Sequence, residues 1–215
     1  DVLKLSSQEN HIYDIETMKE KVILPLVSMG QTEFCLTGGE PALFLNEVEL
    51  ITASIKQSLS KLNKIPRIWL LTNGYNLHKN AEKYLEYGIT NIQVSLASPF
   101  KEKDNYLRRA PHNVDSYKEC VEGIRRLKNL SDIMIEINMI LQPESYFHEW
   151  SNIHDIHEMV NLALSLGVNT LRIIPAVPSG EAKKNRIYFT IDEYKKISDT
   201  VLLINSDPKI LDSGL

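Results

Sequence analysis

The chain has little of several features that would place it in a special class of protein. It contains two cysteines among 215 residues, and no apolar run approaches the length of a membrane-spanning helix. Two cysteines suggest no disulfide framework, so a reducing, cytoplasmic compartment is the expectation. The formal charge of −4 leaves no basic surface for binding nucleic acid. We therefore expect neither a nucleic acid nor a membrane as a partner.

The N-terminus, which begins Asp1-Val2-Leu3-Lys4, has no initiator methionine and no secretory signal. The hydrophobic fraction of 43% and the charged fraction of 24% are ordinary for a globular domain with a full core. We expect residues 1–205 to form one core domain from the interior of a longer, processed or trimmed chain. Residues 206–215 would begin a linker to a possible C-terminal domain. Cys35, in an apolar strand, and Cys120, in a helical pattern, are expected to be small buried hydrophobic residues.

Apolar stretches that end in polar or glycine residues recur five times along the chain. They predict strands over about 33–36, 68–71, 92–96, 133–141 and 170–174. Apolar residues at helical spacing predict helices over about 14–29, 46–62, 79–87, 115–129 and 153–166, and a last one from about residue 191. This alternation predicts an α/β fold with a parallel sheet and right-handed crossovers. A barrel-type sheet and a doubly wound sheet both satisfy the pattern.

Polar residues gather at the predicted carboxyl ends of the strands, where α/β proteins place their ligands. The first strand runs into Thr37-Gly38-Gly39-Glu40-Pro41, in which adjacent glycines let a ligand approach the backbone closely. Further strand ends carry Thr72-Asn73-Gly74, Ser95 to Ser98, Asn138 with Gln142, and Arg172 to Gly180. The opposite ends of the strands carry plain helix stops. This asymmetry predicts a small-molecule site.

In order and approximate spacing, these motifs resemble those of radical S-adenosylmethionine (SAM) proteins. The resemblance covers about residues 14–205 and rests on Leu36-Thr37-Gly38-Gly39-Glu40-Pro41, Leu71-Thr72-Asn73-Gly74, Val94-Ser95-Leu96, residues 104–109, Arg172-Ile173-Ile174-Pro175 and Pro178-Ser179-Gly180. It implies a parallel sheet of alternating β/α units, a partial (β/α)6 TIM-like barrel with the first strand absent.

One departure concerns the Cys-x3-Cys-x2-Cys motif that binds a [4Fe–4S] cluster in this family. The chain lacks the motif, and Cys35 and Cys120 have neither its spacing nor its loop position. We expect the first strand and the cluster cysteines just upstream of Asp1, so that this chain alone would be inactive. A relative that has lost its cluster is the alternative.

The resemblance also implies which residues contact SAM, while it assigns no catalytic residue and no metal ligand. The glycine-rich strand end would bind the SAM amino group, Ser95 the ribose or the carboxylate, and Asn138 the ribose. Either Arg108 or Arg109 would pair with the carboxylate, whereas Ser95 and Asn138 are equally consistent with purely structural roles. The full set is Thr37, Gly38, Gly39, Glu40, Asn73, Ser95, Arg108, Arg109, Asn138, Ile173 and Pro175, in which the segment from Ile173 to Pro175 would recognise adenine through its backbone.

The activity implied is reductive cleavage of SAM to a 5′-deoxyadenosyl radical, which abstracts hydrogen from a substrate, with a reductant such as flavodoxin or ferredoxin. The motif from Arg172 to Ala182 resembles the subgroup with a SPASM or twitch domain, so a peptide or protein substrate is the first expectation. One alternative is a radical SAM enzyme of small-molecule cofactor biosynthesis. Another is a cluster-less, non-catalytic module that binds SAM or a nucleotide.

Overall fold

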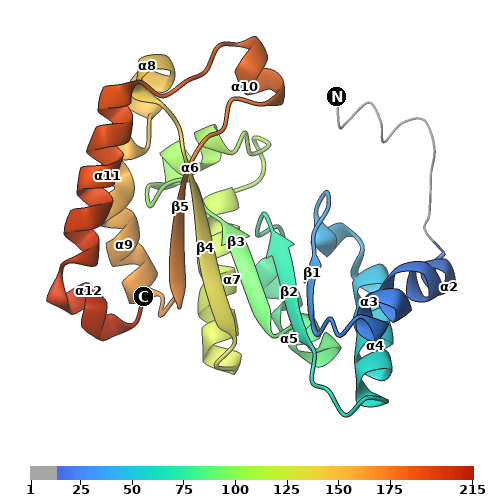
Figure 1. The fold of residues 1–215 in the computed structure, drawn as a ribbon. Helices are drawn as coiled ribbons and strands as arrows, with labels where there is room; N and C mark the ends of the chain where they lie inside the picture. The colour runs from blue at the N-terminus through green and yellow to red at the C-terminus, as the bar shows by residue number, and fades with distance from the viewer. Residues whose placement is uncertain (1–13) are drawn as a thin grey trace.

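A computed structural model describes residues 14–215 of the chain (Figure 1). Its sheet consists of β1 (Glu33–Leu36), β2 (Arg67–Thr72), β3 (Asn91–Ser95), β4 (Met134–Leu141) and β5 (Thr170–Pro175). All neighbouring strands are parallel, and their spatial order β1-β2-β3-β4-β5 is the order of the sequence. A doubly wound sheet requires a reversal of strand order, so this alternative is removed. The predicted α/β fold with barrel-type connectivity is confirmed.

The longer helices form where apolar residues recur at helical spacing. They are α4 (Leu45–Ser60), α5 (Leu77–Tyr87), α7 (Ser116–Leu130), α9 (Ile156–Ser165) and α11 (Ile191–Asn205). Shorter helices were not predicted from the sequence and are α6 (Lys101–Leu107), α8 (Glu144–Phe147), α10 (Gly180–Lys184) and α12 (Pro208–Ser213). α6, α8 and α10 lie toward the carboxyl ends of the strands, at the top of Figure 1. No helix in the described part of the chain is long and apolar enough to cross a bilayer.

The helix predicted over residues 14–29 forms with a widened turn at its centre. It comprises α2 (Ile15–Met18), the π-helical turn η1 (Lys19–Ile23) and α3 (Leu24–Ser28). Pro25 has no backbone N–H to donate to the preceding turn, which accounts for the local change of hydrogen-bond pattern. As predicted, Asp14 caps the helix start by accepting from Glu16 N at 3.3 Å, and Gly30 ends it with a φ of +95°.

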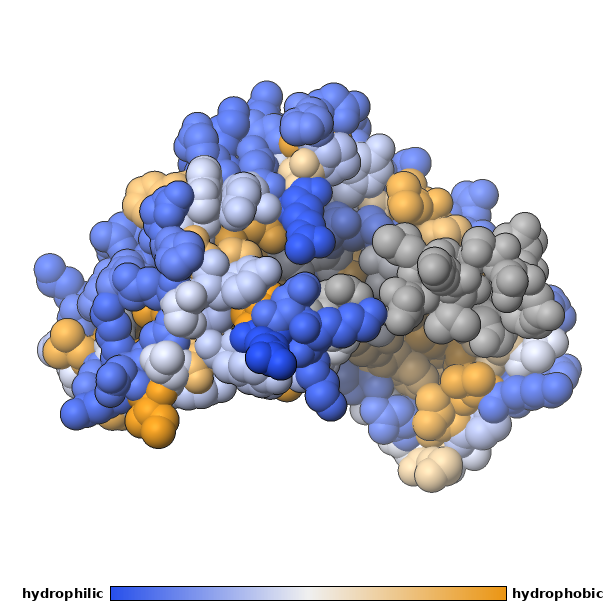
Figure 2. Space-filling view, turned by 90° about the horizontal axis from the view of Figure 1, so that it is seen from above, coloured by the Kyte–Doolittle hydropathy of each residue, from blue (hydrophilic) through white to orange (hydrophobic). Residues whose placement is uncertain are grey.

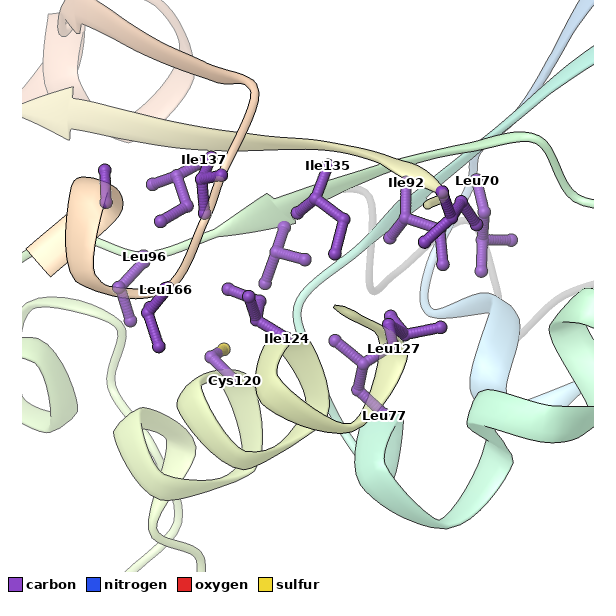
Figure 3. Packing of buried hydrophobic residues seen from close by; sticks show 14 of the residues in the cluster. Leu70, Leu77, Ile92, Leu96, Cys120, Ile124, Leu127, Ile135, Ile137 and Leu166 are labelled. Carbon is purple, nitrogen blue, oxygen red and sulfur yellow. The ribbon is translucent and has the colours of Figure 1, made fainter. Parts of the chain in front are cut away.

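The core lies between the sheet and the helices that cover one of its faces. Figure 3 shows Leu70, Ile92, Ile135 and Ile137 of the strands beside Leu77, Ile124 and Leu127 of α5 and α7, and all of these side chains are fully buried. Complete burial of each such side chain contributes about 1.5–3 kcal/mol to folding. This packing fixes one face of every strand against the helices and leaves the alternate residues on the other face.

We call that second face the open face, because its residues are more exposed than those of the helix-covered face. It carries Cys35, Trp69, Gln93, Asn138 and Arg172, none of which is fully buried. The predicted burial of Cys35 is wrong, since the pleat that turns its two strand neighbours toward the helices turns Cys35 to the open face. Cys120 is fully buried in α7, as predicted.

Candidate functional site

The loop that follows β1 is fastened to the end of β2 by Glu40. Its side chain is buried, with Oε1 accepting from Ala42 N at 3.0 Å and from Thr72 Oγ1 at 2.7 Å, and Oε2 accepting from Asn73 N at 2.7 Å. Pro41 begins a short 3₁₀ turn, η2 (Pro41–Leu43), which ends the strand direction. Glu40 thus holds the carboxyl ends of β1 and β2 together, and protein donors occupy both of its oxygens.

Gly38 and Gly39 leave the backbone of this loop accessible. Gly38 has a φ of +148°, which few side chains tolerate, and a Cβ built on either glycine meets no atom within 4 Å. Together with Thr37 and Glu40 they line a cavity of about 540 Å³. The rest of this cavity runs beside β1 between η1, α3 and α4 and is mainly apolar. A ligand above β1 can therefore approach the backbone of the two glycines directly.

A second cavity, of about 350 Å³, begins on the other side of Glu40 and is also lined by Asn73, Arg108 and Arg109. The Arg108 Nη2 donates to the carbonyl of Asn73, and its Nη1 lies 3.0 Å from the Sγ of Cys120. Arg109 is exposed, with a left-handed φ of +51°. Of the two candidate arginines, Arg108 is therefore the one held in place at the strand ends.

Ser95, the last residue of β3, is paired in register with Asn138, which lies within the second half of β4. With Arg108 they line a third cavity, of about 110 Å³. The Oδ1 atom of Asn138 is buried and has no hydrogen-bond partner among the residues described. An unpaired buried amide oxygen costs about 1–3 kcal/mol, so such atoms in native proteins usually have a ligand or water as partner. The strand ends thus present an acceptor where a ligand hydroxyl was predicted.

The structure brings nine of the eleven predicted residues to these three cavities, which adjoin because they share Glu40 and Arg108. The other two lie apart. Ile173 faces the helical side of the sheet, where it lines a cavity of about 210 Å³ between β5, α9 and α11. Pro175 pairs with Leu141 at the end of β5. Any ligand contact from this segment would come from its backbone, which is the role that the resemblance implied.

Buried charged residues beneath the strand ends were not identified from the sequence. The carboxylate of Asp104 is fully buried, where it accepts from Ala97 N at 2.7 Å and from Ser116 Oγ at 3.0 Å. Burial raises the pKa of Asp104, and the guanidinium of Arg108, 3.6 Å away, partly opposes that rise. The i, i+4 spacing of this pair is a helix signal, yet no helix was predicted between the strand near residues 92–96 and the helix from about residue 115.

Asn152 links the ends of β3 and β4 by hydrogen bonds, because its Nδ2 donates to the carbonyls of Ala97 at 2.6 Å and Ile140 at 2.9 Å. Next to it, the buried Asp155 accepts from Lys103 Nζ at 2.9 Å. Two of these three contacts join residues more than fifty positions apart, so no local sequence pattern predicts them.

The thiols do not form a metal centre. Within residues 14–215 there is no group of three or more His, Cys, Asp or Glu residues placed to hold a metal ion. Burial raises the pKa of Cys120 to about 11, and burial together with Glu33 raises the pKa of Cys35. A [4Fe–4S] cluster is held by several thiolates, and two protonated thiols on different elements do not fit one.

Comparisons with known proteins identify the family. The family model described as Radical SAM superfamily matches residues 7–157. GTP 3′,8-cyclase of Clostridium perfringens (strain SM101 / Type A) is 25% identical over 199 residues, which cover 90% of this chain and 53% of the relative. The probable GTP 3′,8-cyclase of Sulfurisphaera tokodaii is 28% identical over 162 residues, which cover 75% of this chain and 46% of the relative. The chain thus spans about half the length of the curated relatives that it matches.

Solved structures agree on the fold. Native anSMEcpe with bound AdoMet superposes with a TM-score of 0.68 at 15% identity, over 93% of this chain and 53% of that one. The coproporphyrinogen III oxidase HemN of Escherichia coli, a radical SAM enzyme, superposes with a TM-score of 0.61 at 9% identity, over 92% of this chain and 47% of that one. A family match over more than half of the chain shows that this chain belongs to the radical SAM superfamily, whose members use SAM and a [4Fe–4S] cluster.

Proposed function

We propose that this chain forms the SAM-binding part of a radical SAM enzyme, at the carboxyl ends of β1 to β4. The observation that carries the proposal is the continuity of three cavities through Glu40 and Arg108, with the unpaired Oδ1 of Asn138 at one end. Glycine backbone, a fixed guanidinium and an unpaired amide oxygen suit a ligand that carries an amine, a carboxylate and hydroxyls.

Each part of the site has a distinct role in this proposal. The backbone of Gly38 and Gly39 faces the methionyl amino group, Arg108 faces the carboxylate, and Ser95 with Asn138 faces the ribose. A reduced [4Fe–4S] cluster in the full-length protein would supply the electron for cleaving SAM, and the residues of this chain would bind, orient and shield SAM. The two cysteines here do not fit that cluster, so we assign its ligands to other parts of the full-length protein.

The substrate that we propose is a small molecule of the kind handled in cofactor biosynthesis. The similarity to GTP 3′,8-cyclases supports this choice over the peptide or protein first expected from the residues after β5. The match to anSMEcpe with a bound peptide, at 17% identity, supports only the fold. A reductant such as flavodoxin or ferredoxin would supply the electron.

Gly39→Val tests the SAM site with little risk to folding, because the space beside Gly39 is open. In the full-length, anaerobically reconstituted protein we expect SAM affinity, measured by calorimetry, to fall by about tenfold or more, a loss of about 1.4 kcal/mol. The control Ala53→Val likewise produces a valine, on the exposed side of α4, and should leave affinity unchanged. A folded Gly39→Val protein with wild-type SAM affinity would refute the assignment.

Iron analysis of the same reconstituted protein separates the enzyme from the cluster-less alternative. We expect at least one [4Fe–4S] cluster for each protein molecule and 5′-deoxyadenosine after reduction. Protein that is folded and binds SAM but holds no iron would instead establish a non-catalytic SAM-binding module.

A further inference from the structure

Three polar side chains form a connected group on the open face of the sheet. Gln93 and Glu136 are in register on β3 and β4, and Arg172 lies on β5 in register with Asn138, two residues after Glu136. Glu136 accepts a hydrogen bond from Gln93 Nε2 and another, at 3.0 Å, from Arg172 Nη2. Glu136 is only 3% exposed, whereas the side chain of Arg172 is 54% exposed. A buried carboxylate therefore holds one side of an outward-facing guanidinium.

Packing alone does not explain this group. Burying a carboxylate costs several kcal/mol unless charge and hydrogen bonds compensate, and an apolar residue would fill the same place more cheaply. Glu136 has that compensation from its two partners. Arginine offers five N–H donors, yet the structure shows no second acceptor for the Arg172 side chain among the described residues. The arrangement fixes the guanidinium and leaves most of its donors unused.

Arg172 also lies next to the proposed SAM site. Ser95, Asn138 and Arg172 occupy one row across three strands, and the Oδ1 of Asn138 at the centre of that row is unpaired. The next row toward the carboxyl ends carries the apolar pair Ile140 and Ile174. A planar guanidinium beside an apolar row is suited to bidentate binding of a carboxylate or phosphate attached to a less polar body.

We propose that Arg172, held by Glu136, binds an anionic group of the substrate, a carboxylate or a phosphate, on the open face beside SAM. The proposal rests on the proposed radical SAM function and adds a chemical requirement for the substrate. Arg172 is a substrate-binding residue in this scheme. Glu136 acts through Arg172 and is a positioning residue, and Gln93 orients Glu136.

Arginine modification by phenylglyoxal, followed site by site by mass spectrometry, tests the proposal on the full-length protein. Arg126 on α7 is a matched internal control, because its side chain is 50% exposed and is likewise paired with one carboxylate, that of Glu82 on α5. We expect pyrophosphate or glutarate to slow the modification of Arg172 by about threefold or more and to leave Arg126 unchanged. Protection by pyrophosphate alone would identify a phosphate, and protection by glutarate alone a carboxylate. No protection of Arg172, or equal protection of both arginines, would overturn the proposal.

Variants separate this proposal from the SAM site. Arg172→Gln should leave the calorimetric SAM affinity within about twofold of wild type, and Gly39→Val should leave the protection of Arg172 intact. If Arg172→Gln instead weakens SAM binding by about tenfold, the bound anion is the SAM carboxylate and the substrate assignment fails while the SAM site stands. Wild-type protein that binds no SAM would refute the proposed function whatever the anion result.

The positioning role of Glu136 has its own readout. Phenylglyoxal must reach the guanidinium nitrogens, and the ion pair with Glu136 occupies one of them, Nη2. A neutral amide holds a guanidinium less tightly than a carboxylate does. Glu136→Gln should therefore speed the modification of Arg172 by about threefold or more and leave Arg126 unchanged. An unchanged rate at Arg172 would show that Glu136 does not hold the guanidinium.

Discussion

Replacing Glu40 by alanine should destabilise the fold more than a substitution in an exposed ligand site would. Three donors lose their acceptor, namely Ala42 N, the Thr72 hydroxyl and Asn73 N. Each buried donor left unpaired costs about 1–3 kcal/mol. Removing the carboxylate also removes its own desolvation cost, and water from the adjoining cavities can reach part of the gap. We therefore expect a loss of about 3–5 kcal/mol, a large part of the 5–15 kcal/mol of typical domains.

The substitution Glu40→Gln separates the contribution of the negative charge of Glu40 to stability from that of its side-chain shape. The remaining amide oxygen can still accept from Ala42 and Thr72, as Oε1 does. The amide nitrogen, however, would face the N–H of Asn73, so that two donors oppose each other. We expect a loss of about 1–3 kcal/mol, between wild type and alanine.

Urea unfolding of the full-length protein measures both effects, with calorimetric SAM titration on the same samples. Glu86→Ala, at an exposed position of α5, is the control and should change the unfolding free energy by less than about 0.5 kcal/mol. If Glu40→Ala unfolds within 1 kcal/mol of wild type while SAM binding is lost, Glu40 is a ligand residue and the structural role argued from its three hydrogen bonds is wrong.

Three further outcomes follow from local geometry. Gly74→Ala should lower the unfolding free energy by about 2–4 kcal/mol, because Gly74 has a φ of +86° and the new Cβ would lie 2.3 Å from the Sγ of Cys120. A variant as stable as wild type would contradict the packing of α7 against this turn. Iodoacetamide at about pH 8, read by peptide mapping, should label exposed Cys35 in native protein and Cys120 only after unfolding, since burial raises the pKa of Cys120 to about 11; equal native labelling would refute its burial. Burial raises the pKa of Asp104 above its unfolded value, so the native state binds more protons in the window above about pH 3.8 and the contribution of this carboxyl to stability falls as pH rises through that window. The stability of Asp104→Asn relative to wild type, measured by urea unfolding across that window, should therefore improve with rising pH, and a constant difference would contradict the shift.

The fold was predictable because its signals are local and repeated. Alternation of strand and helix patterns indicated a parallel sheet, and glycines at φ above zero ended helices where expected, as at Gly88 and Gly167. A doubly wound sheet could not be excluded from the sequence, because strand order is set by pairing between segments that are distant in the chain. Short helices such as α6 and α8 escaped prediction since seven residues or fewer give too little periodicity to recognise.

The candidate site was predictable only in part. Parallel strands bring their carboxyl ends to one edge, so the polar strand ends were expected to meet there. An apolar run does not show which face of β1 the helices cover. For this reason the prediction that Cys35 is buried was wrong. The alternation of Gln93 with Ser95 and of Glu136 with Asn138 is a signal for a polar strand face that was not used in the prediction. The pairing of Glu136 with Arg172 depends on the register between β4 and β5.

Two buried carboxylates show why residue type alone does not assign a role. Glu40 belongs to the motif that suggested the family, yet two of its three partners are backbone N–H groups of the chain itself. Glu136 belongs to no motif, and its partners are side chains, one of which is a half-exposed guanidinium. A carboxylate whose oxygens accept from the chain's own donors fixes a loop, and the ligand then contacts the backbone of that loop. A carboxylate that holds an exposed cation orients charge toward the solvent, where a substrate can meet it. By this reasoning we propose that Gly38, Gly39 and Arg172 are among the residues that contact ligands, and that the two glutamates determine where those contacts are presented.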